Sequence, residues 1–484
     1  VEVKGDVNKE IEFITHDSRR VRKNTLFVCI CGTRVDGNKF IPQAIEAGAC
    51  AIMTEKDVEV PADITVIKVP NMREAMELAV PYFYDYPGKK MRMIGVTGTN
   101  GKTSSTYMLR DILRKAGYKV GVIGTIKIMI EDEEMPIHNT TPDVIDLQEI
   151  LDKMYKQNID YVVMEVSSHA LDMNRIAGCE YDTAMFTNLT QDHLDYHKTM
   201  ENYALAKAKL FDSLSAPNLV KSNKNAVINL DDELGSKTMI EHTKCNLITY
   251  GIKNDAVLKA ENVEIKASGA SFDVKYKDDC VHFDLKVTGM FNVYNILGVI
   301  GVALAEKISF DLIKETLEAF EAVAGRFELV RQGQDFSVIV DYAHTPDGLE
   351  NVLKTAREIA KKRLIVVFGC GGDRDRTKRP IMGRIAAQLA DVVIATSDNP
   401  RTEDPEFILS EVEAGVLPAL HGNFHEKITD RRTAIFRAIE LAQKDDIVLI
   451  AGKGHENYQI LKTGTIHFDD KEVAIEAIRG KING

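Results

Sequence analysis

Short runs of β-branched and other apolar residues, each followed by a helical pattern, recur along the whole chain. This alternation is typical of α/β units, in which helices connect neighbouring parallel strands. The sequence therefore predicts an α/β fold with parallel sheets. Strands are expected at residues 91–96, 161–166, 184–187, 338–340, 364–368, 392–395 and 447–451. Several of these runs end in polar or glycine-rich residues, and ligands of open parallel sheets gather at such carboxyl ends.

The chain has 484 residues, which is more than a single hydrophobic core usually supports. Two segments interrupt the α/β pattern. One is the polar run Tyr84-Asp-Tyr-Pro-Gly-Lys-Lys90, and the other lies near Gly325-Arg-Phe-Glu328, before an expected strand. We therefore expect three domains, at residues 1–90, 91–328 and 329–484, each within the ordinary size range for a domain.

Composition excludes several classes of protein. The formal net charge of -12 disfavours general nucleic-acid binding, because no long basic block offsets it. Seven scattered cysteines without a Cys-x-x-Cys pair indicate neither a disulfide framework nor a zinc site. No apolar run approaches the roughly 20 residues of a spanning helix, and the first residues do not resemble a signal peptide. We expect a cytoplasmic protein that does not bind membranes.

The strongest local signal is Gly95-Val-Thr-Gly-Thr-Asn-Gly-Lys-Thr-Ser104, which lies between an expected strand and an expected helix. It is interpreted as a phosphate-binding loop. Gly98 and Gly101 let backbone N–H groups face the phosphates, while Lys102 reaches the terminal phosphates and Thr103 offers a hydroxyl to Mg²⁺. The standard motif would place glycine where this chain has Val96. The residues expected to bind ATP here are Gly98, Thr99, Asn100, Gly101, Lys102, Thr103 and Ser104.

The variant Gly98-Thr-Asn-Gly-Lys-Thr103 resembles the superfamily of Mur ligases and folylpolyglutamate synthases. Further segments agree with it: Glu165-Val-Ser-Ser-His-Ala170, Thr187-Asn-Leu-Thr-Gln-Asp-His-Leu-Asp-Tyr-His197 and Tyr203-Ala-Leu-Ala-Lys-Ala-Lys-Leu-Phe211. The resemblance implies a central P-loop ATPase domain with a parallel sheet, and a Rossmann-like C-terminal domain.

The resemblance also implies the catalytic residues, which are Lys102, Glu165, His193 and Lys207. Glu165 and His193, with Thr103, would hold Mg²⁺ beside the phosphates of ATP. Lys207 would react with CO₂ to form a carbamate, a long carboxylate able to hold a second Mg²⁺.

More distant segments carry the rest of the expected nucleotide site. Asn295, in Gly289-Met-Phe-Asn-Val-Tyr-Asn295, resembles the family asparagine that contacts adenine. Arg326 resembles an arginine that reaches ATP across the domain boundary. In Asp341-Tyr-Ala-His-Thr-Pro346, Asp341 would face the ribose and His344 the nucleotide cleft. ATP would then lie between two domains, whose closure would exclude water.

The N-terminal segments Thr15-His-Asp-Ser-Arg19 and Gly32-Thr-Arg-Val-Asp-Gly37 resemble a domain that binds the uridine diphosphate of UDP-MurNAc. Hydroxyl and guanidinium groups suit phosphate oxygens. The family residues for the muramoyl-peptide substrate correspond here to Ser18, Asn139, Thr140, Thr141, Ser167 and Arg175. Where some relatives have glutamine, two residues before Arg175, this chain has Met173.

The third domain carries the clearest signal about the substrate. Asp398-Asn-Pro-Arg401, Gly371-Gly-Asp-Arg-Asp375 and Gly452-Lys-Gly-His-Glu456 resemble a pocket for meso-diaminopimelate. Arg374 and Arg401 would each pair with a carboxylate and Glu456 with an ammonium. Lanthionine has the same two ends, whereas lysine lacks the second carboxylate. The full expected set is Arg374, Asp398, Asn399, Pro400, Arg401, Gly452 and Glu456.

The family resemblance implies an ATP-dependent amide ligase of peptidoglycan synthesis. Such an enzyme would join a diamino acid to the D-Glu carboxylate of UDP-MurNAc-L-Ala-D-Glu through an acyl phosphate. Its expected cofactors are ATP, two Mg²⁺ ions and the carbamate on Lys207, and it is expected to be a monomer that binds small molecules. Addition of L-lysine is the alternative within this class. A nucleotide-dependent regulatory module without ligase activity is the alternative from another class.

Overall fold

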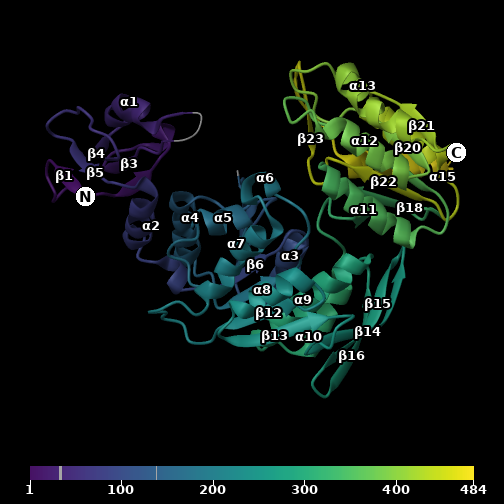
Figure 1. Ribbon diagram of the computed structural model, residues 1–484, viewed down its shortest axis with the longest axis horizontal. Helices are drawn as coiled ribbons and strands as arrows, with labels where there is room; N and C mark the ends of the chain where they lie inside the picture. Colours follow the sequence, from purple (N-terminus) through teal and green to yellow (C-terminus); the bar gives the residue numbers. More distant parts are fainter. Residues whose placement is uncertain (32–34, 138, 484) are drawn as a thin grey trace.

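The computed structural model describes residues 1–31, 35–137 and 139–483. Figure 1 shows three lobes that follow one another along the chain, with the central lobe between the other two. Each lobe is built on its own sheet, and helices flank the sheets (Figure 1). The predicted α/β class is therefore confirmed. The two segments proposed as domain boundaries fall where one sheet ends and the next begins, and β17 starts at Glu328.

The N-terminal lobe has a five-stranded sheet in the order β1-β5-β4-β3-β2, in which only β1 is antiparallel. Its strands are β1 (Glu2–Lys4), β2 (Phe13–Thr15), β3 (Thr25–Val28), β4 (Ala49–Thr54) and β5 (Thr65–Lys68). Its helices are η1 (Ser18–Arg20), η2 (Gly37–Phe40), α1 (Ile41–Glu46) and α2 (Met72–Phe83), and η3 (Pro87–Lys89) leads into the next lobe. The turn after β2 places Ser18 at the start of η1.

The central lobe has an eleven-stranded sheet in the order β16-β15-β14-β13-β12-β11-β6-β10-β7-β8-β9. Its strands are β6 (Arg92–Thr97), β7 (Val120–Ile123), β8 (Ile128–Ile130), β9 (Glu133–Met135), β10 (Tyr161–Glu165), β11 (Thr183–Phe186), β12 (Asn225–Asn229), β13 (Asn246–Gly251), β14 (Leu258–Lys266), β15 (Gly269–Tyr276) and β16 (Asp279–Leu285). Its helices are α3 (Lys102–Lys115), α4 (Val144–Lys156), α5 (Ser168–Asp172), α6 (Leu194–His197), α7 (Met200–Ser213), α8 (Glu233–Glu241), α9 (Met290–Ala305) and α10 (Phe310–Ala319).

The strand order of this sheet creates the site. β6 pairs in parallel with β10 on one side and with β11 on the other. The loop after β6 therefore lies between the carboxyl ends of both neighbours, although these strands are far apart in sequence. This pairing brings the predicted phosphate loop, Glu165 and the segment from Thr187 to one edge of the sheet. Ligands of open parallel sheets collect at such an edge.

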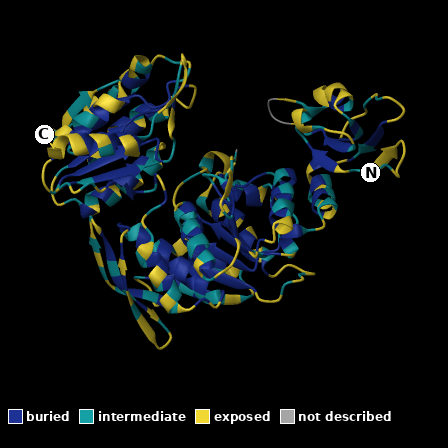
Figure 2. Cartoon of the chain, turned by 180° about the vertical axis from the view of Figure 1, so that it is seen from behind, coloured by how far each residue is buried: buried dark blue, intermediate teal, exposed yellow. Residues whose placement is uncertain are grey.

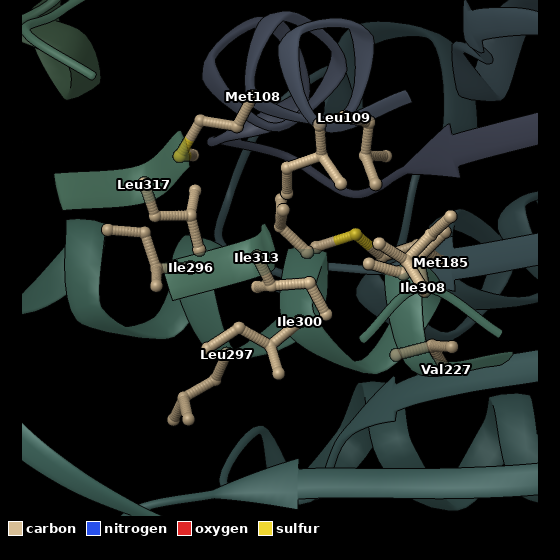
Figure 3. Close-up of a cluster of buried hydrophobic side chains, with 14 of the residues drawn as sticks. Met108, Leu109, Met185, Val227, Ile296, Leu297, Ile300, Ile308, Ile313 and Leu317 are labelled. Carbon is tan, nitrogen blue, oxygen red and sulfur yellow. The ribbon is translucent and has the colours of Figure 1, made fainter. Parts of the chain in front are cut away.

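The central core supports this edge from one face of the sheet. Met108 and Leu109 of α3 pack with Ile296 and Ile300 of α9, and α10 adds further apolar side chains (Figure 3). The remaining side chains labelled in Figure 3 are Met185, Val227, Leu297, Ile308, Ile313 and Leu317. α3, the helix that follows the loop, buries its apolar face in this core, which fixes where the start of α3 points.

The C-terminal lobe has a six-stranded sheet in the order β17-β18-β22-β19-β20-β21, in which only β17 is antiparallel. Its strands are β17 (Glu328–Leu329), β18 (Ser337–Asp341), β19 (Leu364–Phe368), β20 (Val392–Ala395), β21 (Phe424–Lys427) and β22 (Ile447–Ala451), and a separate hairpin contains β23 (Tyr458–Leu461) and β24 (Gly464–His467). Its helices are α11 (Pro346–Ile359), α12 (Lys378–Leu389), α13 (Pro405–Val416), η4 (Leu417–Ala419), α14 (Arg431–Leu441) and α15 (Asp470–Asn483).

The inner strands of the C-terminal sheet are buried between two layers of helices (Figure 2). This explains their continuous apolar sequences, because both faces of a parallel strand are covered. β19, β20 and β22 span the residues predicted for them, and β18 is longer than predicted by one residue at each end. Within the described residues no helix is long and apolar enough to cross a bilayer. All seven cysteines are free thiols.

Candidate active site

The loop between β6 and α3 has two positions that only glycine fits. Gly98 has φ of 146°, and a Cβ there would lie 1.8 Å from Thr187 Oγ1. Gly101 has φ of 85°, and a Cβ there would lie 2.1 Å from Asn295 Oδ1. Since side chains are excluded, the backbone approaches its neighbours closely. α3 begins at Lys102 without a side-chain cap, so its first N–H groups are available to an anion.

The residues after β11 fix the shape of this loop. Thr99 N donates to Asn188 O at 2.8 Å, and Asn100 N donates to Asn188 Oδ1 at 3.0 Å. Thr187 Oγ1 donates to Asn100 O at 2.7 Å. The predicted phosphate loop and the segment from Thr187 are thus joined by hydrogen bonds. These bonds hold the loop in its shape.

Lys102 and the buried Lys207 share one acceptor at the loop. Lys102 Nζ donates to Gly98 O at 2.9 Å and to Thr99 O at 2.8 Å, and Lys207 Nζ donates to the same Gly98 O at 2.8 Å. Burial, together with the charge of Lys102, lowers the pKa of Lys207 well below its usual value. Burial also lowers the pKa of Lys102, while the charge of Glu165 opposes that effect. An anionic group beside these two amines would favour their charged forms.

Glu165 ends β10 with a fully buried carboxylate. Its Oε1 accepts from Thr125 N and its Oε2 from Thr125 Oγ1, both at 2.9 Å. Thr140 Oγ1 lies 3.1 Å from Thr125 Oγ1 and extends the network. A buried carboxylate that is held in place suits a hard cation, and the buried hydroxyl of Thr103 is a second oxygen donor.

His193 lies at the rim of the site. It adopts a left-handed φ of 54°, and its side chain is 44% exposed. Its ring lies 6.2 Å from the ring of Tyr203, whose hydroxyl is 3.2 Å from Thr99 Oγ1. Among the described residues, no three His, Cys, Asp or Glu side chains converge as a ready-made metal centre. The donors fit Mg²⁺ that also binds phosphate oxygens and water, which is its usual coordination.

The residues predicted for the muramoyl peptide lie beside Glu165. Thr141 Oγ1 donates to Glu165 O at 2.9 Å and accepts from Ser167 N at 3.1 Å. Arg175 Nη1 contacts Thr141 O at 3.4 Å, and its buried Nε has no hydrogen-bond partner among the described residues. The other guanidinium contact is Met173 Sδ at 3.4 Å, at the position where some relatives have glutamine. The expected anion-binding groups therefore gather next to the phosphate loop.

Ser18 lies apart from this group, on the N-terminal lobe. Its hydroxyl is 3.1 Å from Gln43 Oε1. A groove of about 1150 Å³ lies between the N-terminal and central lobes, and Asp17 and Asn139 both line it. Of the second predicted uridine segment, Gly32, Thr33 and Arg34 are outside the described residues. Its last residues lead into η2, where Asp36 Oδ1 accepts from Asn38 N.

The residues predicted for the nucleoside come from both sides of the junction between the central and C-terminal lobes. Asn295 lies against Gly101, and its buried Nδ2 has no partner within the described part of the chain. The Arg326 guanidinium lies 5.0 Å from the Tyr342 ring. Asp341 accepts from Phe327 N at 2.7 Å, and burial raises its pKa. His344 is exposed, with Nδ1 2.9 Å from Tyr342 O.

The predicted diamino-acid residues form one cluster in the C-terminal lobe. Arg401 Nη1 donates to Gly372 O at 2.9 Å and to Asn399 O at 3.3 Å. A Cβ on Gly371 would lie 2.9 Å from Arg401 Nη1 and 3.9 Å from Arg374 Cγ, so both arginines adjoin this glycine. A Cβ on Gly372 would lie 2.0 Å from Pro400 O. The two arginine-bearing turns are thus packed against each other.

The third predicted segment, Gly452–Glu456, packs against the other two. Gly452, with φ of 122°, approaches Asp398 so closely that a Cβ would lie 2.8 Å from Asp398 Oδ2. Asn399 Nδ2 donates to Glu456 Oε2 at 3.0 Å. The cluster therefore presents carboxylates beside guanidinium groups, as recognition of an amino acid with charged groups at both ends requires.

Three residues around these sites were not predicted from sequence. Thr125 holds both oxygens of Glu165, Lys453 is buried beside Glu456, and Gln459 Nε2 donates to Asp398 O at 2.7 Å. Lys453 lies within a quoted motif, so its position between Gly452 and Gly454 was a usable signal. Thr125 and Gln459 carry no local signal.

Comparison with known families covers nearly the whole chain. The Mur ligase family, catalytic domain, matches residues 10–84, and the Mur ligase middle domain matches residues 96–303. The Mur ligase, glutamate ligase domain, matches residues 325–454.

Relatives and solved structures agree. UDP-N-acetylmuramoyl-L-alanyl-D-glutamate–2,6-diaminopimelate ligase of Clostridium botulinum is 48% identical over 476 residues, covering 97% of this chain and 96% of the relative. The ligase of that name from Bacillus velezensis is 49% identical, covering 97% and 94%. A solved structure of a ligase of that name has a TM-score of 0.69 at 33% identity, covering 99% and 97%. MurF ligase from Thermotoga maritima in complex with ADP has the same fold, with a TM-score of 0.66 at 17% identity, covering 97% and 98%. The chain belongs to the Mur ligase family.

Proposed function

We propose that the chain is an ATP-dependent ligase that adds meso-diaminopimelate to the D-Glu carboxylate of UDP-MurNAc-L-Ala-D-Glu. The observation that carries this proposal is similarity over nearly the full length, at 45% to 49% identity, to ligases named for diaminopimelate. The cluster of Arg374, Arg401 and Glu456 supports the same substrate. We place the reaction in the cytoplasm, where ATP is abundant, and propose that one chain suffices.

A carboxylate does not condense with an amine in water, so it must first be activated. We propose that the loop Gly98–Gly101 and the start of α3 hold the triphosphate, with Lys102 moving from its loop carbonyls to the terminal phosphate. A carboxylate oxygen of the substrate then attacks the γ-phosphorus, and ADP leaves. Thr141, Ser167 and Arg175 would hold the substrate beside this point.

Mg²⁺, when bound, would offset the charge that develops on the transferring phosphoryl group. Thr103, Glu165, His193 and a carbamate on Lys207 would hold it. The amine of Lys207 forms the carbamate by attacking CO₂ and losing one proton. Its burial and the neighbouring Lys102 favour the neutral amine that this reaction needs. The carbamate would also place a negative charge beside the Lys102 ammonium.

The diamino acid would complete the reaction from the C-terminal lobe. Arg374 and Arg401 would bind its carboxylates and Glu456 an ammonium, which directs the other amine toward the acyl phosphate. That amine attacks the acyl carbon after losing a proton, and the tetrahedral intermediate expels phosphate. Asn295, Arg326, Asp341 and His344 would hold the nucleoside at the lobe junction, where closure excludes water.

The substrate is tested by offering UDP-MurNAc-L-Ala-D-Glu, ATP and Mg²⁺ with diaminopimelate, lanthionine or lysine in turn. We expect diaminopimelate and lanthionine to react and lysine to react poorly, because an arginine left unpaired in the pocket costs about 1–3 kcal/mol, or roughly 5- to 150-fold in kcat/KM. Product mass and phosphate release measure the outcome. Efficient addition of lysine would contradict the substrate assignment, and amino-acid-independent phosphate release would favour a regulatory module.

A further inference from the structure

Lys453 is a fully buried lysine at the centre of the proposed amino-acid pocket, with no exposed side-chain surface. Glycines on both sides make this position possible: Gly452 has φ of 122° and Gly454 has φ of 54°. A Cβ on Gly454 would lie 2.6 Å from the side chain of Tyr342, so the backbone is packed tightly here. Burying an ammonium is costly unless it is paired, so its partners define its role.

The partners of Lys453 are the predicted ligands themselves. Its Nζ contacts Glu456 Oε2 and Asn399 Oδ1, each at 3.2 Å. Asn399 in turn donates from Nδ2 to the same Glu456 Oε2 at 3.0 Å, while its Oδ1 also accepts from Ile460 N at 2.9 Å. Both polar atoms of the Asn399 side chain are therefore engaged within the protein.

The two donors meet on one oxygen of Glu456. Lys453 and Asn399 both contact Oε2, and neither contacts Oε1. A carboxylate oxygen offers two lone pairs, so Oε2 is fully used by these two donors, and Oε1 is the oxygen open to a further partner. The Tyr458 hydroxyl also lies close to this carboxylate. The Glu456 side chain is 18% exposed, so an incoming group can reach it.

We propose that Lys453 and Asn399 are positioning residues that hold Glu456 by one oxygen, so that its other oxygen receives an ammonium of the amino-acid substrate. This inference rests on the proposed function. Lys453 acts only through Glu456: it fixes the carboxylate and offsets the cost of keeping it charged before the substrate arrives. Asn399 is thereby assigned a supporting role toward Glu456.

The test is a double-variant cycle with Lys453→Met, Glu456→Gln and the combined variant, assayed with diaminopimelate. Glu456→Gln is expected to raise the KM for diaminopimelate about 100-fold, since it removes a charged hydrogen bond. Lys453→Met is expected to raise that KM about 10- to 30-fold, with kcat and the KM for ATP changed by less than about three-fold. In the combined variant, the loss is expected to match Glu456→Gln alone within about two-fold.

Lys462→Met, at an exposed lysine in the β23–β24 turn, is the matched control and is expected to behave as wild type. Asn399→Asp provides a second variant should Lys453→Met fail to fold, because it removes the other donor to Oε2 and is nearly isosteric. Its effect is also expected to vanish in the Glu456→Gln background.

Two results would overturn the assignment. One is an unchanged KM for diaminopimelate in Lys453→Met. The other is an equal loss from Lys453→Met with and without Glu456→Gln, which would give Lys453 a role independent of Glu456. Wild-type protein that forms no product with diaminopimelate would contradict the proposed function, and this inference with it. Wild-type activity combined with additive losses would contradict this inference alone.

Discussion

Lys207→Ala is expected to lower the rate of amide formation from ATP, measured as ADP release, on the order of 10³-fold. The variant removes charge stabilisation from the transferring phosphoryl group. Lys207 is 1% exposed and shares Gly98 O with Lys102. A simple ammonium there would repel Lys102 and the metal ion. The proposed carbamate would instead place a negative charge beside Lys102, and this variant tests that proposal.

Chemical rescue separates this explanation from a structural role. Acetate or propionate is expected to restore part of the activity of Lys207→Ala, because a small carboxylate can occupy the space of the missing carbamate. Lys209→Ala is the matched control: Lys209 lies two residues away on α7, is 48% exposed and pairs with Asp172. It is expected to retain activity. Full activity of unrescued Lys207→Ala would remove Lys207 from the metal site.

Arg401→Met is expected to lower kcat/KM for diaminopimelate on the order of 10²- to 10³-fold, because a two-pronged pairing with a carboxylate is lost. Arg401 Nη1 is committed to Gly372 O and Asn399 O. Of the five N–H donors of a guanidinium, those on Nε and Nη2 therefore remain for the substrate. The preference for diaminopimelate over lysine should shrink by a similar factor, since lysine lacks that carboxylate.

Arg376→Met is the control for Arg401, because it lies in the neighbouring turn, is 53% exposed and pairs with Glu411. Exposed ion pairs contribute little, so activity is expected to stay within about two-fold of wild type. Steady-state rates at varied diaminopimelate and lysine concentrations measure both variants. If Arg401→Met keeps the wild-type preference for diaminopimelate over lysine, another group binds the second carboxylate.

Much of the fold could be predicted from the sequence because strands buried on both faces leave an unmistakable apolar run. β19, β20 and β22 are such strands. The candidate phosphate loop was also visible, since glycines at 98 and 101 mark a close backbone approach that little else would require. Strand order was not visible: nothing local indicates that β6 inserts between β10 and β11.

The side chains that hold the candidate site residues in place could not be predicted from the sequence. Thr125 hydrogen-bonds to Glu165, which lies 40 residues away in the sequence. A single threonine in a loop carries no periodic signal that would predict this contact. Lys453 lies within a quoted motif, but the motif did not indicate that its ammonium is buried against Glu456. Side-chain direction depends on tertiary packing, which pattern analysis does not reach.

The central claim is that the site transfers the γ-phosphoryl group of ATP to the D-Glu carboxylate before the amide forms. Substrate labelled with ¹⁸O in both oxygens of that carboxylate tests it directly. Attack by one carboxylate oxygen on phosphorus leaves that oxygen on phosphate when the amine displaces it. We predict one labelled oxygen in each phosphate released and one in the new amide carbonyl, as measured by mass spectrometry. Unlabelled phosphate accompanying amide formation would contradict the acyl-phosphate mechanism.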